Sequence, residues 1–281
     1  MKPVVGTSRP GFPLRMPTNT DKSSATKNVA TSALKTSAIA LKYPQKKPNN
    51  LASSVSTGFG LDSVAVRNRM VQKLAAQGVQ DSRVLAALSH IERHRFVDSA
   101  LVNQAYEDTS LPIGLGQTIS KPNVVARMLE LLVNRPIDGP HQPPNGKLGR
   151  VLEIGTGCGY QAALLAQLAT EVYSIERLRG LHDRARANLR SMRIANLHLL
   201  FGDGMAGYAK GAPYAAIIAA AGGDALPQAW IDQLALGGRL VAPVQSAGGA
   251  QALVVVDKTN KGITQTLLEA VHFVPLKSGT S

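Results

Sequence analysis

Three glycines at alternate positions form the segment of this 281-residue chain best suited to contact a ligand. The run "RVLEIGTGCGYQAALLA" (residues 150–166) begins apolar, passes through Gly155, Gly157 and Gly159, and continues in a helical pattern. Ligands of open α/β sheets bind beyond the carboxyl ends of the strands, where glycines let the backbone approach the ligand. We therefore predict a cofactor site at this loop, which also includes Thr156.

The spacing of these glycines distinguishes between cofactors. A dinucleotide-binding loop follows G-x-G-x-x-G, whereas this loop follows G-x-G-x-G and has Tyr160 in place of the last glycine. A P-loop carries Lys directly after its last glycine, and no Lys follows Gly159 here. The spacing therefore disfavours a phosphate-binding loop and, with it, a nicotinamide-dependent oxidoreductase.

Acidic residues stand at the ends of three consecutive expected strands, at Glu153, Glu176 and Asp203, the last beside Gly204. Glu176 can accept hydrogen bonds from both ribose hydroxyls, of NAD as well as of other nucleosides. Asp203 can accept one from an adenine amino group. Glu153 would repel pyrophosphate and attract a cation, such as the sulfonium of S-adenosylmethionine. Each carboxylate alone fits a surface or capping role equally well, but together they predict one acidic pocket for an adenosine-type ligand.

The sequence after Arg150 alternates between strand-like and helix-like segments, as in a mostly parallel sheet with helices on both faces. The expected strands cover residues 150–155, 171–176, 197–203, 215–221, 239–245, 252–258 and 264–274. The expected helices cover residues 160–169, 178–192 and 227–236. Because little helix separates the last three strands, the predicted fold is a doubly wound, mostly parallel α/β sheet with an antiparallel C-terminal edge.

The first 60 residues differ in composition from the rest of the chain. They are rich in Ser, Thr, Ala, Asn and Pro, and hold nine Lys or Arg against one acidic residue, or +8 of the net +13. We expect a disordered basic extension, with a transit peptide or a polyanion-binding arm as alternatives. Residues 61–281 are expected to form a single domain, with a helical part over 61–145 and an α/β core over 146–281.

Helical spacing also marks the part of the chain before the glycine loop. The expected helices cover residues 61–77, 81–91 and 121–133, and a loop is expected over residues 111–120. Asp81 is placed to cap the second helix, and Pro122 lies in the first turn of the third.

Composition excludes several classes of protein. A chain with 4% aromatic residues offers few faces for stacking on single-stranded nucleic acid. A lone cysteine, Cys158, allows neither an intramolecular disulfide nor a cysteine-based metal site. No apolar run reaches the roughly 18–20 residues of a membrane helix, and no secretory apolar region stands near residue 1. We expect a cytoplasmic monomer that binds no metal, membrane or nucleic acid.

The motifs around these residues resemble those of a known class. "LEIGTGCGY", "YSIE" and "GDG" resemble the three cofactor motifs of class I S-adenosylmethionine-dependent methyltransferases. "AYEDTSLPIGLGQTISKPNVVARMLELL" (residues 105–132) resembles the N-terminal signature of the protein-L-isoaspartate O-methyltransferase family. "RHRFV" (93–97) and "VHFVPL" (271–276) also resemble this family, so that the similarity covers residues 61–277.

This resemblance implies a Rossmann-like fold and a repair reaction. Members methylate the free α-carboxylate of L-isoaspartyl and D-aspartyl residues in damaged proteins, and the ester then collapses to a succinimide without further help. The active-site serine of the family corresponds to Ser120, which we expect to orient the substrate. The alternative is that Ser120 caps the following helix. The other residues implied in substrate binding are Gln117, Thr118, Ile119, His272 and Val274.

The chemistry of the acceptor agrees with this expectation. A carboxylate is ionised at neutral pH and is already a nucleophile, so that its methylation requires orientation more than a base. Thr118 and Ser120 offer hydroxyl donors to such an anion. A general base is one interpretation of His272, but a half-buried strand histidine is the simpler expectation. Two positions depart from the family pattern: Ala215, where Asp is common, and Lys121, where Gln is frequent.

Three other functions compete with this interpretation. A base-methylating enzyme would usually carry Asp or Asn before Pro-Pro-aromatic after the fourth strand, where this chain reads "AAAGGD", or a nucleophilic Cys outside the glycine loop. A methyltransferase of small molecules shares the same cofactor motifs. A non-catalytic module would use the basic extension for binding.

Overall fold

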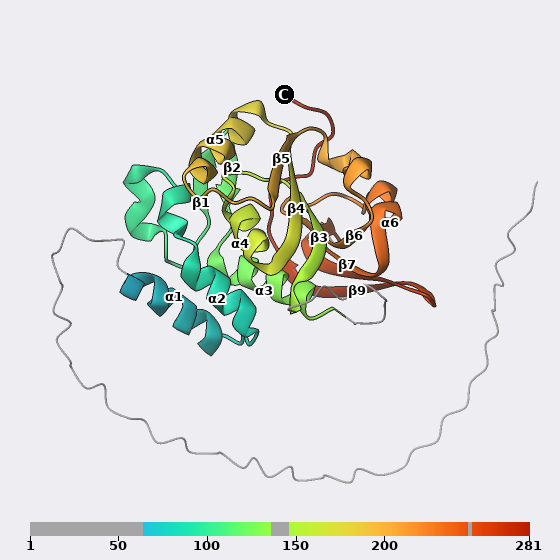
Figure 1. Ribbon diagram of the computed structural model, residues 1–281, viewed down its shortest axis with the longest axis horizontal. Helices are drawn as coiled ribbons and strands as arrows, with labels where there is room; N and C mark the ends of the chain where they lie inside the picture. The colour runs from blue at the N-terminus through green and yellow to red at the C-terminus, as the bar shows by residue number, and fades with distance from the viewer. Residues whose placement is uncertain (1–63, 136–145, 247–248) are drawn as a thin grey trace, which may run out of the picture. The chain divides into compact units, whose positions relative to one another are not determined.

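The computed structural model describes residues 64–135, 146–246 and 249–281, shown as the coloured ribbon of Figure 1. The expected basic extension and its alternatives lie outside these ranges. No helix within the described ranges is both long and apolar enough to cross a membrane.

A seven-stranded sheet forms the centre of the described structure, in the order β5-β4-β3-β6-β7-β8-β9. The strands are β3 (Leu148–Ile154), β4 (Ala169–Glu176), β5 (Leu197–Phe201), β6 (Tyr214–Ala219), β7 (Leu234–Gln245), β8 (Gln251–Thr259) and β9 (Gly262–Val271). The pairs from β5 to β7 are parallel, and β8 and β9 are antiparallel additions. The mostly parallel sheet with an antiparallel edge is thus confirmed. The strand order reverses at β3, where doubly wound sheets bind ligands.

Helices pack on both faces of this sheet (Figure 1). They are α1 (Val64–Ala76), α2 (Ser82–His90), α3 (Pro122–Val133), α4 (Tyr160–Leu168), α5 (Arg179–Arg190) and α6 (Gln228–Gln233). Four short 3₁₀ turns are described, η1 (Arg93–Phe96), η2 (Ser99–Gln104), η4 (Gly204–Ala206) and η5 (Ala209–Gly211). Val151 of β3 belongs to the core that α1 to α5 cover, whereas its neighbour Leu152 belongs to the core beside Trp230 of α6. The alternation of side chains along a strand therefore separates two apolar layers.

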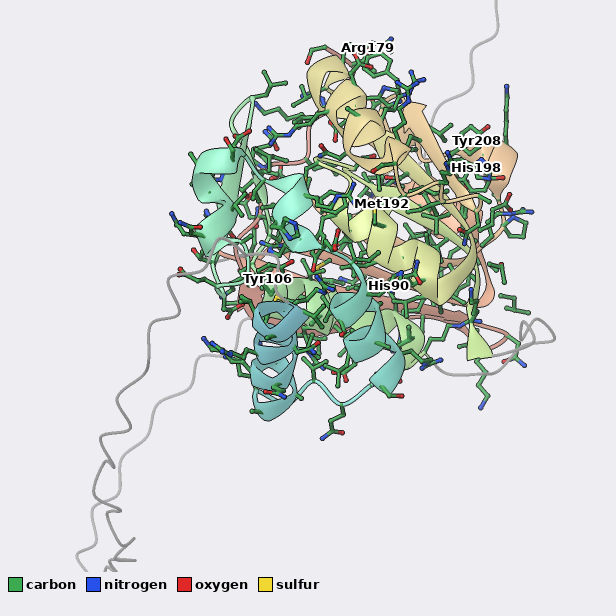
Figure 2. All side chains as sticks on the ribbon, turned by 60° about the vertical axis from the view of Figure 1, so that its left-hand side comes forward. His90, Tyr106, Arg179, Met192, His198 and Tyr208 are labelled. Carbon is green, nitrogen blue, oxygen red and sulfur yellow. The ribbon has the colours of Figure 1, made fainter. Side chains whose placement is uncertain are left out.

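Aromatic side chains reinforce the α6 side of the sheet. The ring of Tyr173 lies 4.8 Å from that of His198, 5.3 Å from that of Tyr208 and 6.1 Å from that of Tyr214, measured between centroids. Figure 2 labels His198 and Tyr208, two members of this aromatic cluster. The cluster ties β4, β5 and β6 together on the face away from α4.

Several local expectations were wrong. The helix expected over 227–236 ends at Gln233, because Leu234 pairs with Tyr214 of β6 and Gly237 has a positive φ of 76°. The loop expected over 111–120 is a hairpin of β1 (Leu111–Gly114) and β2 (Gln117–Ile119). Its turn is formed by Leu115 and Gly116, which have φ values of +51° and +69°, as a tight two-residue hairpin turn requires.

The last expected strand also ends early. β9 stops at Val271, and the chain then leaves the sheet edge. Val274 accepts a backbone hydrogen bond from Gly222 at 2.9 Å, and Leu276 donates one back at 2.7 Å. The segment after β9 is therefore held by the loop that follows β6, at the carboxyl end of the parallel strands. His272 lies outside the strand and is exposed, contrary to the half-buried position expected.

The capping role expected for Asp81 is confirmed. Its Oδ1 accepts hydrogen bonds from the backbone N–H groups of Arg83 at 2.9 Å and Val84 at 3.4 Å. The Arg83 guanidinium returns to the carboxylate at 2.7 Å, and this side-chain contact lowers the pKa of Asp81. The Asp81 side chain thus fixes the N-terminus of α2, a helix in the part of the chain before the glycine loop.

We expect Asp81→Ala to lower the free energy of unfolding by about 1–2 kcal/mol, because α2 loses its cap. The shift corresponds to a decrease in melting temperature of roughly 2–8 °C for a domain of this size, measurable by calorimetry. Asp81→Asn keeps a capping oxygen and should lose less than half as much. Equal losses in both variants would show that the cap contributes little.

Candidate active site

The glycine loop between β3 and α4 has a backbone that only glycine adopts readily. Gly155, Gly157 and Gly159 have φ values of +89°, +57° and +91°. A Cβ on Gly159 would also stand 2.8 Å from the Cδ1 of Leu189 on α5. The absence of side chains at these glycines thus allows both the left-handed turn and the close packing of α5 against the loop.

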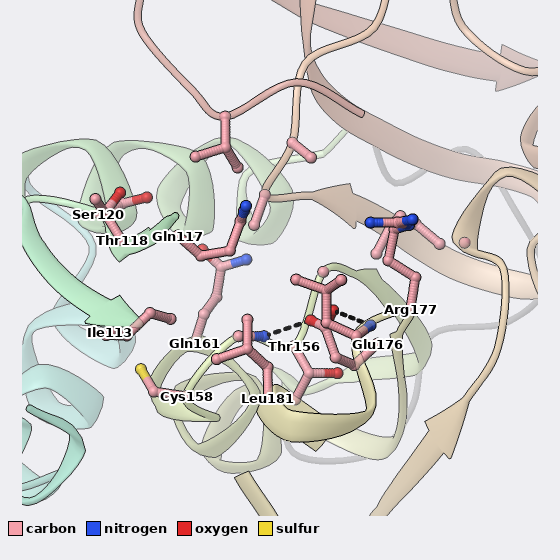
Figure 3. A pocket seen from close by; sticks show the side chains of 18 of the residues that line it. Ile113, Gln117, Thr118, Ser120, Thr156, Cys158, Gln161, Glu176, Arg177 and Leu181 are labelled. Atoms are coloured by element: carbon pink, nitrogen blue, oxygen red, sulfur yellow. Dashed lines mark hydrogen bonds between the residues drawn. The ribbon is translucent and has the colours of Figure 1, made fainter. Parts of the chain in front are cut away.

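A cavity of about 300 Å³ opens above this loop, between the β1–β2 hairpin and the segment after β9 (Figure 3). It includes five of the residues expected to bind the cofactor: Gly155, Thr156, Gly157, Glu176 and Gly204. It also includes five expected on the substrate side: Gln117, Thr118, Ile119, Ser120 and Val274. The structure therefore brings together residues from the two halves of the sequence.

Glu176 holds the floor of the cavity in place. Its Oε2 accepts the N–H of Gly157 at 2.9 Å, and its Oε1 accepts the N–H of Leu178 at 2.9 Å. Figure 3 shows the carboxylate between the loop and Arg177. Each carboxylate oxygen can accept more than one hydrogen bond, so that both remain able to receive a hydroxyl of a ligand.

Two other expected carboxylates do not line the cavity, and the expectation of one acidic pocket is wrong in this respect. Asp203 accepts the N–H of Met205 at 2.8 Å and that of Gly279 at 2.7 Å. Glu153 points to the α4 side of the sheet, because strand neighbours alternate and Leu152 and Ile154 face the α6 side. Direct contact of these two carboxylates with a cofactor therefore stays a prediction.

Glu153 is instead part of a buried polar chain beneath the loop. It is fully buried, and the Ser174 hydroxyl, on the neighbouring strand, donates to its Oε2 at 2.5 Å. Ser174 Oγ lies 2.6 Å from the hydroxyl of Thr156, which borders the cavity. Burial raises the pKa of Glu153 from its ordinary value of 4.5 to about 8, so that the side chain is mostly protonated at neutral pH.

Gln161, in the first turn of α4, is a cavity residue that the sequence analysis did not single out. Its amide faces the Glu153 carboxyl and acts to lower the pKa of that group, but its buried Nε2 makes no hydrogen bond of normal length among the described residues. Figure 3 shows this amide directed into the cavity. An amide NH₂ group has two donors, so that it can also donate to an acceptor on a ligand, such as a carboxylate. The sequence signal that could have identified Gln161 is its position directly after the glycine loop.

These side chains fit S-adenosylmethionine. Its ribose hydroxyls suit Glu176, its methionine carboxylate suits a donor of the Gln161 amide, and its adenine suits apolar lining residues such as Leu178 and Leu181. The described residues contain no group of three His, Cys, Asp or Glu side chains arranged to hold a metal ion. Cys158 is buried, and burial raises the pKa of its thiol, which disfavours a nucleophilic role.

Ser120 lies at the boundary of two cavities. Besides the cofactor cavity it lines a second one of about 450 Å³, here named the outer groove, together with Ser110, Lys121, Val124 and residues 270–273. The N-cap of α3 is Lys121, and the N–H of Asn123 in the first turn donates to Asp108 Oδ1 at 2.8 Å, so that the capping alternative for Ser120 is wrong. His272 lines the outer groove and not the cofactor cavity.

The strand order and the glycine loop at its reversal define a class I S-adenosylmethionine-dependent methyltransferase. The family model of protein-L-isoaspartate(D-aspartate) O-methyltransferase matches residues 65–281, and the chain belongs to this family.

Named relatives support this assignment. The chain is 61% identical over 225 residues to a protein-L-isoaspartate O-methyltransferase of Methylibium petroleiphilum, covering 79% of this chain and 81% of the relative. It is 60% identical over 230 residues to that of Leptothrix cholodnii, with coverages of 81% and 79%.

Solved structures show the same fold. One protein-L-isoaspartate O-methyltransferase has a TM-score of 0.66 at 27% identity, with 75% of this chain and 66% of that chain covered. A putative one from Plasmodium falciparum, solved with S-adenosyl-L-homocysteine, has a TM-score of 0.63 at 24% identity, with coverages of 75% and 98%.

The buried proton on Glu153 should make stability depend on pH. Between about pH 4.5 and 8 the folded protein keeps this proton while the unfolded chain releases it, so that stability falls as pH rises. We expect Glu153→Gln to remove this contribution. Its free energy of unfolding relative to wild type should rise by about 1.4 kcal/mol per pH unit in that window, as measured by urea denaturation. Parallel curves for the two proteins would contradict a protonated Glu153.

Proposed function

We propose that this protein transfers the methyl group of S-adenosylmethionine to the free α-carboxylate of L-isoaspartyl residues and to the free side-chain carboxylate of D-aspartyl residues in damaged proteins. Membership of the family and its relatives supports the activity. The position of Ser120, which borders both the cofactor cavity and the outer groove, is the observation on which the assignment of acceptor and donor sides rests.

On the donor side, bound S-adenosylmethionine supplies an electrophilic methyl group on a sulfonium. Glu176 would accept the ribose hydroxyls, while Gly155 and Gly157 allow close approach of the ligand to the backbone. Gln161 would donate to the carboxylate of the methionine part. The chain thereby places the cofactor at the carboxyl end of β3, where the strand order reverses.

On the acceptor side, we infer that the peptide lies in the outer groove and extends one carboxylate past Ser120. The Ser120 hydroxyl donates to this carboxylate and orients it, and no strong base is required because the acceptor is already ionised. His272, exposed in the outer groove, is placed to contact the peptide rather than the reacting atoms. Backbone contacts with the segment around Val274 would explain tolerance of varied sequences.

The electrostatics of the cavity suit an anionic acceptor. Glu153 is mostly neutral at pH 7, and the charge of Glu176 is engaged by two backbone N–H groups. An ionised Glu153 beneath the loop would add a negative charge that repels an anionic substrate. Its protonation removes this charge, which supports a carboxylate as the acceptor.

The remaining features of the proposal follow from the sequence. We infer that residues 61–281 act as one catalytic domain, preceded by a basic extension of separate purpose. The protein would work as a monomer in the cytoplasm on isoaspartyl-containing proteins, without nucleic acid. Its single cysteine fits a reducing compartment.

Two peptides that differ only in Asp versus isoAsp test the reaction directly. With labelled S-adenosylmethionine, we expect base-labile methyl transfer to the isoAsp peptide at a rate at least a hundredfold above that to the Asp peptide. The reason is that only the isoAsp linkage presents a free α-carboxylate on a short arm. Equal labelling of both peptides, or labelling of a small molecule alone, would reject the proposed substrate.

Two variants should separate the roles of the acceptor and donor sides. Ser120→Ala should lower kcat at least tenfold and leave the Kd for S-adenosylhomocysteine within twofold, because only orientation of the acceptor is lost. Glu176→Ala should weaken that Kd by about 10–100-fold, because acceptors for buried donors are removed. Isothermal titration and steady-state kinetics provide both numbers. If Ser120→Ala lost affinity for S-adenosylhomocysteine, the assignment of Ser120 to the acceptor side would be wrong.

A further inference from the structure

Arg93, in the "RHRF" turn η1, is a buried cation that the mechanism above does not use. Its side chain is 0% exposed, and burial lowers the pKa of the guanidinium. Among the described residues it has no carboxylate partner within ion-pair distance. Instead, its Nε donates to the carbonyl of Ala105 at 2.8 Å, and its Nη2 donates to the carbonyls of Ser120 at 2.8 Å and Thr109 at 3.5 Å.

Such an arrangement is costly for stability alone. Removal of a charge from water is unfavourable by several kcal/mol unless its partners compensate, and apolar residues of similar volume often stabilise a core better. The planar guanidinium offers several N–H donors in a fixed geometry, which suits it to hold several carbonyls at once. The chain thus carries at this position a group better suited to fix a local geometry than to add stability.

The contacts of Arg93 connect the acceptor side with the donor side. Its Cζ lies 4.9 Å from the centroid of the Tyr160 ring. Tyr160 is 1% exposed, follows Gly159 directly and begins α4. The same guanidinium therefore contacts the backbone of Ser120 and the first residue after the glycine loop.

We propose that Arg93 is a positioning residue, which holds Ser120 at the distance from the glycine loop that methyl transfer requires. This inference rests on the proposed function. It assigns to Arg93 no contact with substrate or cofactor, and its effect passes through the Ser120 carbonyl. A misplacement of about 1 Å in an active site can cost on the order of a hundredfold in rate, so that loss of this contact should affect catalysis more than binding.

The first test replaces Arg93 in the full chain with Lys or Gln. Turnover of the isoAsp peptide is expressed per binding site, counted by titration with S-adenosylhomocysteine, so that unfolded protein does not enter the rate. We expect kcat to fall about tenfold or more in Arg93→Gln and by a smaller factor in Arg93→Lys, which keeps the charge but not the fork of donors. The Kd for S-adenosylhomocysteine should stay within twofold of wild type.

A double-mutant cycle with Ser120→Ala separates positioning from general structural damage. If Arg93 acts through Ser120, its replacement should change kcat less than threefold once the Ser120 hydroxyl is absent. A purely structural role predicts the same loss in both backgrounds, and that result would overturn the proposal. Where Arg93→Gln yields no S-adenosylhomocysteine-binding protein, the conservative Arg93→Lys completes the cycle.

Arg135 provides a matched control. Its Nη1 donates to the carbonyls of Ala215 at 3.2 Å and Gly237 at 3.1 Å, on strands β6 and β7 and not at Ser120. Arg135→Lys should lower the melting temperature and leave kcat within twofold. A loss of kcat in Arg135→Lys equal to that in Arg93→Lys would also overturn the proposal. If wild type methylates no isoAsp peptide, the proposed function fails first, and the two failures remain distinct.

Discussion

The hydrogen bond from the Gly157 N–H to Glu176 is the contact on which the geometry of the site depends. It joins the turn after β3 to the end of β4, and the second oxygen of the same carboxylate holds the chain as it enters α5. The three left-handed glycines make this turn possible, because side chains there would be strained or would collide with α5. One carboxylate thereby sets the floor of the cavity before any ligand arrives.

A second layer of polar groups lies beneath that floor and differs from it in charge. Glu153, Ser174 and Thr156 form a buried chain without a cation, and burial leaves the Glu153 carboxyl mostly protonated at neutral pH. This chain of hydroxyls supports the loop without an additional negative charge beneath the cavity. The neutral network beneath the loop supports the turn, whereas Glu176 borders the cavity and is the carboxylate proposed to contact the ligand.

The sequence predicted the fold class and the glycine loop, because both depend on local patterns, whereas the position of Ser120 beside the cofactor residues was expected from the family resemblance. It did not predict the directions of Glu153 and Asp203, since proximity to a strand end does not say which side of the sheet a residue faces. The position of His272 depended on where β9 would leave its partner, which is a tertiary contact. The role of Arg93 was hidden for a similar reason, because its partners are backbone carbonyls distant in the sequence and leave no side-chain pattern.

The position of Ser120 on both cavities also bears on how large a substrate the site can accept. Ser120 lines both the cofactor cavity and the outer groove, and under the proposed function only an arm of a few atoms extends from one to the other. The bulk of a polypeptide can stay outside whatever its length or fold. Under the proposed function, the site therefore has to fit only the short branch that carries the carboxylate and not the rest of the polypeptide. One enzyme can then act on many different damaged proteins.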